Sequence, residues 1–376
     1  MKLISIGYLD KNILYPIIGG VINCIYKFIL SDKESTKLTE HSLILSVDSS
    51  LGMSLSFFLL LFYKKRKKPK TGELTEKKMK SHEIKLEYID QYEEIRYNKY
   101  KYILISSVID FLVTILVYNY CINLELTMWI LDILFMYLFS YFIFKMKLYR
   151  HHKISILIIF VTGFILNLIH DRYIKILTDI NLIFSAIIKL FCEIFISFGL
   201  VINKYTMEKK FCSSFELCFY QGVITFILFT FFLIIATCFD IVDNFFVYYN
   251  DFKNSIKKET LMFILVMLLQ FLKNLFIFAT IENTTAFHYL IIIVIGELSS
   301  SIKNIIDESE DNSLIENIVI IICLFIIFFM ILVFIEIIEL KCFGLQKNTK
   351  KEISNRAEID KNINALERDT LYSEMN

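Results

Sequence analysis

The chain is poor in the residues that soluble domains use to turn and to face water. Its 376 residues include two prolines, ten glycines and one tryptophan, and charged residues make up only 21%. A soluble domain of this length normally carries more charge and more turn residues. Hydrophobic residues reach 56% and aromatic residues 15%, so the composition indicates a membrane protein without a sizeable soluble core.

Several motifs that would define a function are also missing. The sequence has no G-x-x-x-x-G-K-[S/T] phosphate-binding loop, which argues against ATP as the energy source. It has no Gly/Thr repeat typical of an ion-selectivity filter. Its eight cysteines form no C-x-x-C pair, so we interpret them as small apolar residues rather than disulfide or zinc ligands. The start lacks a basic segment followed by a cleavage site, so we expect the first apolar stretch to remain as a helix.

Apolar stretches, each about as long as a bilayer is thick, make up more than half of the chain. A helix needs about 20 apolar residues to cross the hydrocarbon core. The ten predicted spans are residues 13–30, 41–63, 102–121, 126–145, 154–170, 181–202, 217–239, 260–281, 285–306 and 317–339. The sequence therefore predicts an all-α integral membrane protein with ten transmembrane helices.

Lysine and arginine are distributed unequally between alternate connecting segments. With a cytoplasmic N-terminus, 29 of them fall on the cytoplasmic side and 8 on the opposite side. Because cytoplasmic loops retain positive charge, we expect the N-terminus (1–12), the basic loop 64–101 and the tail 340–376 to be cytoplasmic. The tail is polar and is expected to be disordered.

Two short segments bear on location. The basic run 64–70 lies beside a predicted span, which favours an orientation anchor or contact with anionic lipid over nucleic-acid binding. Residues 372–375 read Tyr-Ser-Glu-Met, which resembles a Tyr-x-x-bulky sorting signal. We therefore expect an internal membrane, of the Golgi/ER or the lysosome/vacuole type.

The ten spans divide into two halves of five, residues 13–170 and 181–339. An odd number of spans per half gives the second half the opposite orientation, as in transporters built from inverted repeats. The two halves share no convincing sequence identity, so the repeat is inferred from the number of spans alone.

Residues 103–169 resemble the third to fifth helices of the drug/metabolite transporter superfamily, in its solute carrier 35-like branch, which contains nucleotide-sugar transporters. There a D-(x)3-T helix, here Asp110 to Thr114, leads through a very short turn into the next span. A basic segment follows, here 145–153, and then a span with an internal glycine, here Gly163. The turn at 122–125 would make the two helices antiparallel neighbours.

Two further segments resemble the same branch. Residues 211–222 are similar to its S-x-x-E-L-x-x-Y-E-G start of helix seven, and residues 279–288 to its turn into helix nine. The resemblance covers roughly residues 13–339 and implies a cavity lined by helices one to four and six to nine. Residues 129–133 depart from the Met-x-Arg-Gly-Ser of many members and Gln221 replaces a glutamate, so substrates known elsewhere in the family do not carry over.

Polar residues inside the spans are the candidate site residues, because ionisable groups at membrane depth usually face a cavity or a partner. Asp110 and Asp132 lie on adjacent predicted helices and are expected to form a pair that carries a proton, or else to bond neighbouring hydroxyls. Lys189 and Glu193 are spaced i,i+4 and form either a structural pair or part of a cavity. The full set of substrate-cavity candidates is Asp110, Asp132, Lys189, Glu193, Gln221, Gln270, Lys273, Asn274 and Glu297.

The candidates on the eighth predicted helix suggest the charge of the solute. Gln270, Lys273 and Asn274 lie within about one turn, where a cation and two amides would suit an anionic or zwitterionic molecule. The same residues would also serve hydrogen bonding between helices.

The sequence thus predicts a secondary transporter of a small polar solute, in contact with the lipid bilayer and with no cofactor, metal ligand or catalytic residue. An integral-membrane transferase and a non-transporting membrane scaffold remain alternatives. A transferase usually needs clustered His or Asp, whereas His151 and His152 lie beside lysines and are interpreted as orientation charge. A homodimer is also compatible with the sequence.

Overall fold

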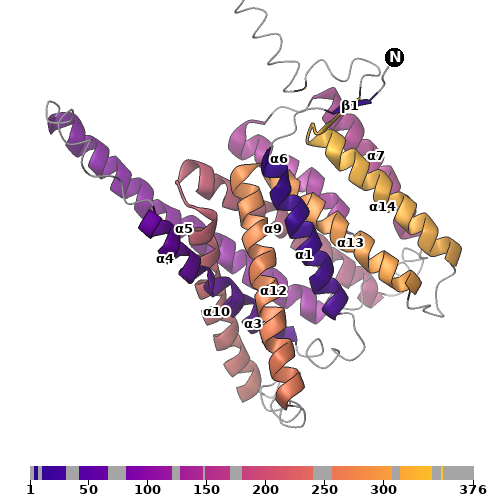
Figure 1. Cartoon of the computed structure of the whole chain (residues 1–376), viewed down its shortest axis with the longest axis horizontal. Helices are drawn as coiled ribbons and strands as arrows, with labels where there is room; N and C mark the ends of the chain where they lie inside the picture. Colours follow the sequence, from indigo (N-terminus) through magenta and orange to yellow (C-terminus); the bar gives the residue numbers. More distant parts are fainter. Residues whose placement is uncertain are drawn as a thin grey trace, which may run out of the picture.

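Helices form nearly all of the structure. The computed structural model describes residues 4–6, 11–30, 42–66, 82–120, 128–146, 149–169, 180–239, 256–306, 314–340 and 349. The helices, shown in Figure 1, are α1 (Leu14–Leu30), α3 (Ser42–Ser54), α4 (Ser56–Arg66), α5 (His82–Tyr120), α6 (Asp132–Phe144), α7 (Arg150–Ile169), α9 (Ile180–Lys209), α10 (Ser214–Cys238), α12 (Ile256–Asn283), α13 (Tyr289–Ile306) and α14 (Leu314–Phe334). Short 3-10 helices are η1 (Lys11–Ile13), η3 (Met128–Leu131) and η4 (Ala286–His288), and the strands are β1 (Ile4–Ile6) and β2 (Ile338–Leu340).

Seven helical segments are long and apolar enough to cross a membrane by length and composition. They are Leu43–Leu61, Asn98–Val117, Arg150–Leu168, Asn181–Lys209, Ser214–Cys238, Thr260–Asn283 and Ala286–Lys303. The other three predicted spans coincide with shorter apolar helices, Leu14–Ile29, Met128–Phe144 and Ile318–Phe334. The prediction of an all-α, multi-pass membrane protein is confirmed at this level.

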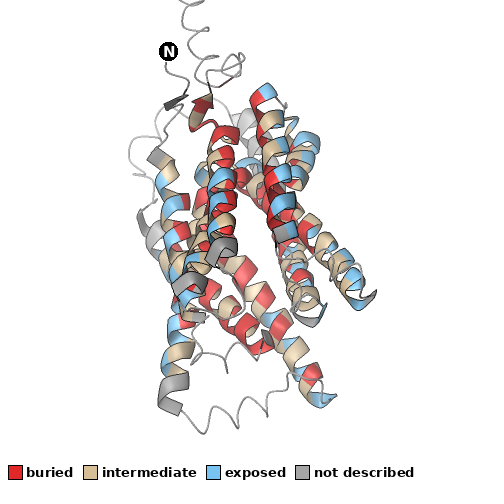
Figure 2. Ribbon diagram, turned by 90° about the vertical axis from the view of Figure 1, so that its right-hand side faces the viewer, coloured by how far each residue is buried: buried red, intermediate tan, exposed pale blue. Residues whose placement is uncertain are grey.

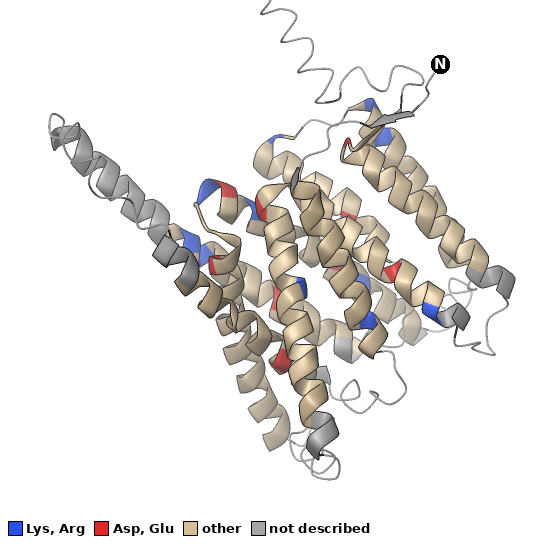
Figure 3. Cartoon of the chain, viewed as in Figure 1, with Lys and Arg blue, Asp and Glu red and all other residues tan. Residues whose placement is uncertain are grey.

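The outward faces of the helices are apolar. Leu157, Phe231 and Leu261 are each more than 60% exposed, and Figure 2 shows such exposed positions along the outside of the helices. Charged residues are sparse along the described helices, as Figure 3 shows. A surface of this kind is suited to lipid, because an exposed apolar area of this size is rare on a soluble monomer.

The helices pack as a bundle in which neighbours are often distant in sequence. Helix α1 packs on α12 and α13, α3 on α10 and α12, and α9 on both α5 and α6. Helices α7 and α14 pack on each other at one end of the bundle, whereas α4, α5 and α10 lie at the other end (Figure 1). The largest buried cluster of apolar side chains joins α6, α9, α10, α12, α13 and α14.

The second predicted span, 41–63, is not one continuous helix. The chain turns at Leu55, whose N–H donates to the carbonyl of Gly52 at 3.0 Å, and Phe58 N–H donates to Leu55 at 3.1 Å. These bonds run three residues back rather than four, which tightens the chain between α3 and α4. Broken helices at membrane depth are tolerated where they are buried in protein, and this one packs on α10.

One other predicted boundary was wrong, and the predicted 64–101 loop contains helix. Helix α5 begins at His82, inside that loop, and runs for 39 residues, or about 58 Å at the usual rise. The span predicted to end at 339 stops at Phe334, and β2 then pairs antiparallel with β1. The predicted turn 122–125 and most of the tail 340–376 lie outside the described residues.

Gly222 holds α10 against the turn between α3 and α4. A Cβ on this residue would lie 2.6 Å from Met53 Cβ and 2.7 Å from the backbone nitrogen of Ser54. Gly222→Ala should therefore lower the melting temperature of the detergent-solubilised protein, since overpacking costs roughly 1–3 kcal/mol. Gly199→Ala is the control, because its Cβ would meet nothing nearer than Ile109 at 3.7 Å. Equal melting temperatures for the two variants would contradict this packing.

Candidate functional site

A cavity of about 470 Å³ lies between α3, α5, α9, α10 and α12, with Tyr289 of α13 in its wall. Its size is that of a site for a small organic molecule. Polar groups come from every one of these helices: Ser46, Ser49, Ser50, Ser106, Asp110, Thr114, Lys189, Asn203, Gln221, Gln270, Lys273, Asn274 and Tyr289. Apolar residues such as Leu45, Ile109 and Phe229 complete the lining.

The cavity brings together most of the residues predicted from the sequence. Six of the nine candidates line it: Asp110, Lys189, Gln221, Gln270, Lys273 and Asn274. The other three, Asp132, Glu193 and Glu297, are not part of the lining and have partners elsewhere. No lining residue comes from α1, α6, α7 or α14 among the described parts of the chain, so the predicted contribution of helices one and four was wrong there.

Lys273 projects from α12 into the cavity without an ion pair to any described carboxylate. Its ammonium group lies 4.6 Å from the centre of the Tyr26 ring, a cation–π contact. The Gln270 amide donates to the Tyr26 hydroxyl and fixes that ring one turn away. The lysine is therefore oriented by an aromatic ring and keeps its N–H donors for another partner.

Asp110 faces Lys273 from α5. The two groups attract each other, and the amide of Gln221 hydrogen-bonds the Asp110 side chain. Ser106 donates to Gln221 Oε1 at 3.3 Å, which orients that amide with its NH₂ toward the carboxylate. Asn203 adds a buried Oδ1 that has no hydrogen-bonding partner in the structure. The cavity thus offers a cation and an anion to a solute.

A second polar cluster adjoins the cavity on α9. Lys189 pairs with Glu193 at 3.1 Å, and Ser197 donates to Asp132 at 2.9 Å. Asp132 and Glu193 are also hydrogen-bonded to each other. Lys189 reaches both this cluster and the cavity lining, so its one positive charge balances the single negative charge that two acids sharing a proton carry.

The predicted pair of Asp110 and Asp132 is not formed. Helices α5 and α6 each pack on α9, which places Asp110 with Gln221 and Asp132 with Glu193. The prediction assumed that a short turn makes consecutive helices neighbours, but a third helix lies between them. Tyr289 interacts electrostatically with Asp110, Asp132 and Glu193 and so lies between the two acidic groups.

Glu297 binds Lys27 instead of facing the cavity. Their N···O distance is 2.7 Å and both side chains are 30% exposed. The adjacent Gly296 allows α1 to approach closely, because a Cβ there would lie 2.2 Å from Asn23 Nδ2. The amide of Asn23 donates in turn to the carbonyl of Ile292 at 3.1 Å. Gly296 and Glu297, for which the sequence suggested a position in the cavity, therefore both serve the packing of α1 on α13.

Asp48 on α3 is a fully buried acid. Neither of its carboxyl oxygens has a hydrogen-bonding partner among the residues that the structure describes. It lies one turn before Gly52, which packs on the carbonyl of Met267 in α12, and it does not line the cavity. The sequence showed an acid inside a predicted span but not which face it occupies.

The segment that leads into α10 is a fixed corner of the bundle. Ser213 is the N-cap of α10 and its side chain accepts from Glu216 N–H. Glu216 binds Lys99 of α5 at 2.6 Å, with both side chains mostly buried. Burial raises the pKa of the neighbouring Cys212 thiol, and the charge of Glu216 raises it further. This cysteine is therefore an unreactive packing residue, as the sequence predicted for the cysteines generally.

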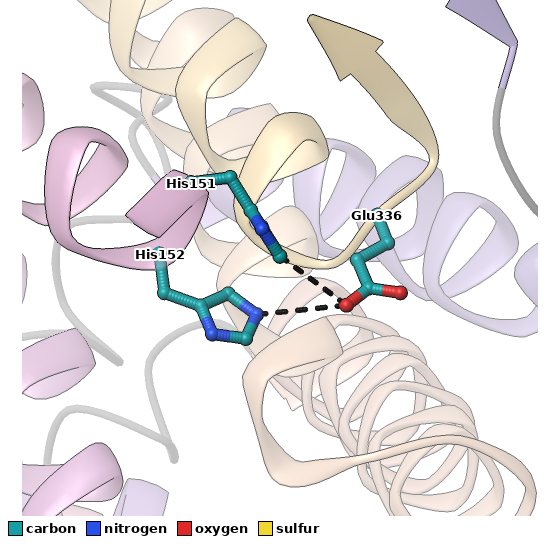
Figure 4. A group of neighbouring side chains, drawn as sticks. All are labelled: His151, His152 and Glu336. Atoms are coloured by element: carbon teal, nitrogen blue, oxygen red, sulfur yellow. Dashed lines mark hydrogen bonds and ion pairs between the residues drawn. The ribbon is translucent and has the colours of Figure 1, made fainter. Parts of the chain in front are cut away.

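A third cluster, which sequence reasoning missed, joins the start of α7 to the end of α14. His151 Nε2 lies 3.2 Å and His152 Nε2 lies 3.8 Å from Glu336 Oε1, and Figure 4 shows both rings directed at that carboxylate. All three residues are buried. One potential ligand atom from each lies within 4.8 Å of the others. The adjacent histidines were visible in the sequence, but their partner is 185 positions away.

The backbone at Glu336 is unusual for its residue type. Glu336 has a φ of 64°, in the left-handed region. Its N–H donates to Val333 and that of Ile337 to Leu332, which is the Schellman arrangement at the end of a helix. Glycine is the usual residue at this position, since other residues incur roughly 1–2 kcal/mol of strain. A glutamate retained there has its carboxylate held at a defined place.

No protein-family model matches the chain, and no curated protein sequence is significantly similar to it. The arguments for function therefore rest on the residues and their arrangement. The resemblance to drug/metabolite transporters in particular stays a hypothesis.

Lys189→Met should destabilise the protein strongly, because Glu193 and Asp132 would remain buried beside each other without their cation. Removing one partner of a buried pair costs roughly 3–5 kcal/mol. Lys189→Met combined with Glu193→Gln should regain most of the loss in melting temperature, since the uncompensated charge is gone. A single variant as stable as wild type, or a double variant no better than the single one, would contradict this role.

Proposed function

We propose that the protein is a secondary transporter that moves a small polar organic solute across a membrane by alternating access. The observation that carries the proposal is the polar cavity between membrane-spanning helices, with Lys273 and Asp110 facing each other across it. Charged groups at membrane depth are costly and are retained mainly where they bind a partner or a ligand. The sequence has no phosphate-binding loop for ATP, so the drive is an ion gradient or solute exchange.

The solute is anionic or zwitterionic. Of the described charged residues that line the cavity, Lys189 is paired with Glu193, whereas Lys273 has a ring beneath it and no bound carboxylate. An acidic group of the solute would bind the ammonium group of Lys273. The amides of Gln270 and Asn274 lie within one helical turn of Lys273 and would orient the solute. A second, cationic group of a zwitterion would face Asp110.

The proposed architecture is two inverted repeats of five helices, 13–170 and 181–339, as the resemblance to the drug/metabolite transporter superfamily implies. In support, both halves line the cavity: α3 and α5 come from the first, and α9, α10 and α12 from the second. The pairing of β1 with β2 puts residues near both ends of the chain on one side of the bundle. We assign that side to the cytoplasm of an internal membrane, from the distribution of lysine and arginine.

The direct test is uptake or exchange in proteoliposomes containing the purified full-length chain. The panel comprises labelled nucleotide sugars, nucleotides, amino acids and short peptides. Saturable movement of one class, absent from empty liposomes, is the expected result. Binding without movement of any class would favour a non-transporting role.

Lys273→Gln should reduce transport of the charged solute roughly tenfold or more, since a hydrogen bond to a charged group contributes about 1.5–3 kcal/mol. Lys303→Gln is a matched control. Its ammonium also lies 4.6 Å from an aromatic ring, that of Phe28, but the residue does not line the cavity. Both variants should elute as folded protein in size-exclusion chromatography. Normal transport by Lys273→Gln would mean that the lysine only packs and that the solute is neutral.

Asp110→Asn should abolish accumulation driven by a pH gradient while leaving exchange of solute between equal concentrations. The reason is that an amide keeps the shape of the site but cannot bind and release a proton. Asp48→Asn, which alters a buried acid outside the cavity lining, should keep both activities. If Asp48→Asn rather than Asp110→Asn loses accumulation, the coupling group is not in the cavity.

A further inference from the structure

The cluster of His151, His152 and Glu336 lies outside the cavity and has no role in the transport proposed above. Two imidazoles and one carboxylate are a donor set with which proteins bind zinc and similar divalent metals. We propose that these three residues form a binding site for a divalent first-row transition metal, which clamps the start of α7 to the end of α14.

The distances fit such an ion after small movements. Zinc is bound by histidine nitrogen and carboxylate oxygen at about 2.0–2.2 Å, so two ligands of a tetrahedral ion lie about 3.3 Å apart. The Nε2 atoms of His151 and His152 lie 3.2 and 3.8 Å from Glu336 Oε1. One of these distances already matches the spacing of two bound ligands, the other is slightly longer, and the three potential ligand atoms lie within 4.8 Å of one another (Figure 4).

The backbone holds the carboxylate in place for this purpose. Glu336 occupies the left-handed position of the Schellman turn, where glycine would be free of strain. Strained backbone of this kind is found where a side chain has to be held at a functional site. The turn itself requires this conformation, as at Lys145 after α6, and at Glu336 it directs a carboxylate toward two histidines.

The ring nitrogen of His151 that faces away from Glu336 also bears on how the site would bind a metal. Among the described residues, neither His151 Nδ1 nor the hydroxyl of Ser155, one turn further along α7, has a hydrogen-bonding partner, and both are buried. A metal-bound histidine usually donates its other N–H to a nearby acceptor, and Ser155 stands on the same helix face as His151. The Ser155 hydroxyl is therefore the acceptor that this proposal assigns to His151.

His152 needs a change of tautomer. Its Nδ1 accepts from the backbone N–H of Tyr149 at 3.2 Å, in the manner of a capping box, so the metal-free ring carries its proton on Nε2. Coordination through Nε2 moves that proton to Nδ1, so the ring stays neutral and the hydrogen bond from Tyr149 N–H is given up. The loss of this hydrogen bond is small beside the gain of a coordinate bond.

The test uses the full-length protein in detergent, first stripped with a chelator. Zn²⁺ is titrated in competition with a chromophoric chelator, and Co²⁺ is added separately to record its visible absorption. The wild type should bind one equivalent, with Co²⁺ bands typical of nitrogen and oxygen ligands. His151→Asn and Glu336→Gln should bind at least about 100-fold more weakly, since even the loss of an outer partner weakens binding by about 10–100-fold. His288→Asn should bind as the wild type does, because His288 bonds Thr285 away from the cluster.

Glu336→Gly separates metal binding from folding. Glycine relieves the left-handed conformation but also removes the buried carboxylate that His151 and His152 contact, so the melting temperature of each protein is compared with its own metal-free value. Zn²⁺ should raise the melting temperature of the wild type but not that of Glu336→Gly, because only the former binds the ion. The proposal is overturned if the wild type binds no more tightly than Glu336→Gln, or if Glu336→Gly keeps the Zn²⁺-dependent shift.

Discussion

Charged side chains buried between helices have to find partners within the protein, because the bilayer offers none. A charge at a helix centre costs roughly 2.5–3.5 kcal/mol on insertion scales. Three ion pairs meet this demand in the described structure: Lys27 with Glu297, Lys99 with Glu216 and Lys189 with Glu193. Two of them join helices that are far apart in sequence, α1 to α13 and α5 to α10. The paired charges lie outside the cavity lining or, like Lys189, at its edge, whereas Lys273 has no ion pair among the described residues and lines it.

The positions of most helices could be predicted from the sequence because the apolar length of a span is a local property. Where the helices break or stop was harder to predict. The run from Ile318 to Leu340 is apolar almost throughout, yet the chain leaves the helix at Glu336 by a Schellman turn. The split at Leu55 likewise depends on close packing of Gly52 and Gly222 against other helices. Hydropathy measures neither backbone conformation nor the space beside a glycine.

The same distinction separates the site residues that were predicted from those that were missed. Gln270, Lys273 and Asn274 lie within about one turn of a single helix, so a common face was evident and they do line the cavity. Asp132 does not pair with Asp110, because α9 lies between α5 and α6, but it does bond a neighbouring hydroxyl, that of Ser197, as the other prediction had it. The link between His151 and Glu336 spans 185 positions and depends on α7 packing on α14. Residue type and spacing identify the donors, but only the tertiary structure shows which of them meet.

The two interhelical ion pairs also bear on how the proposed transporter would move. Each joins the first half of the chain to the second, and they lie near opposite ends of the bundle. Asn12 bonds the backbone of Asn283, and the adjacent Glu282 accepts from the N–H of Ser214, so the start of α1 lies at the same end as the Lys99–Glu216 pair. Lys27 is 15 residues further along α1, which is about 22 Å at the rise of an α-helix. In alternating access the halves separate at one end while they remain joined at the other. In the transporter proposed above, opening at either end would therefore break one of these two ion pairs while the other keeps the halves joined.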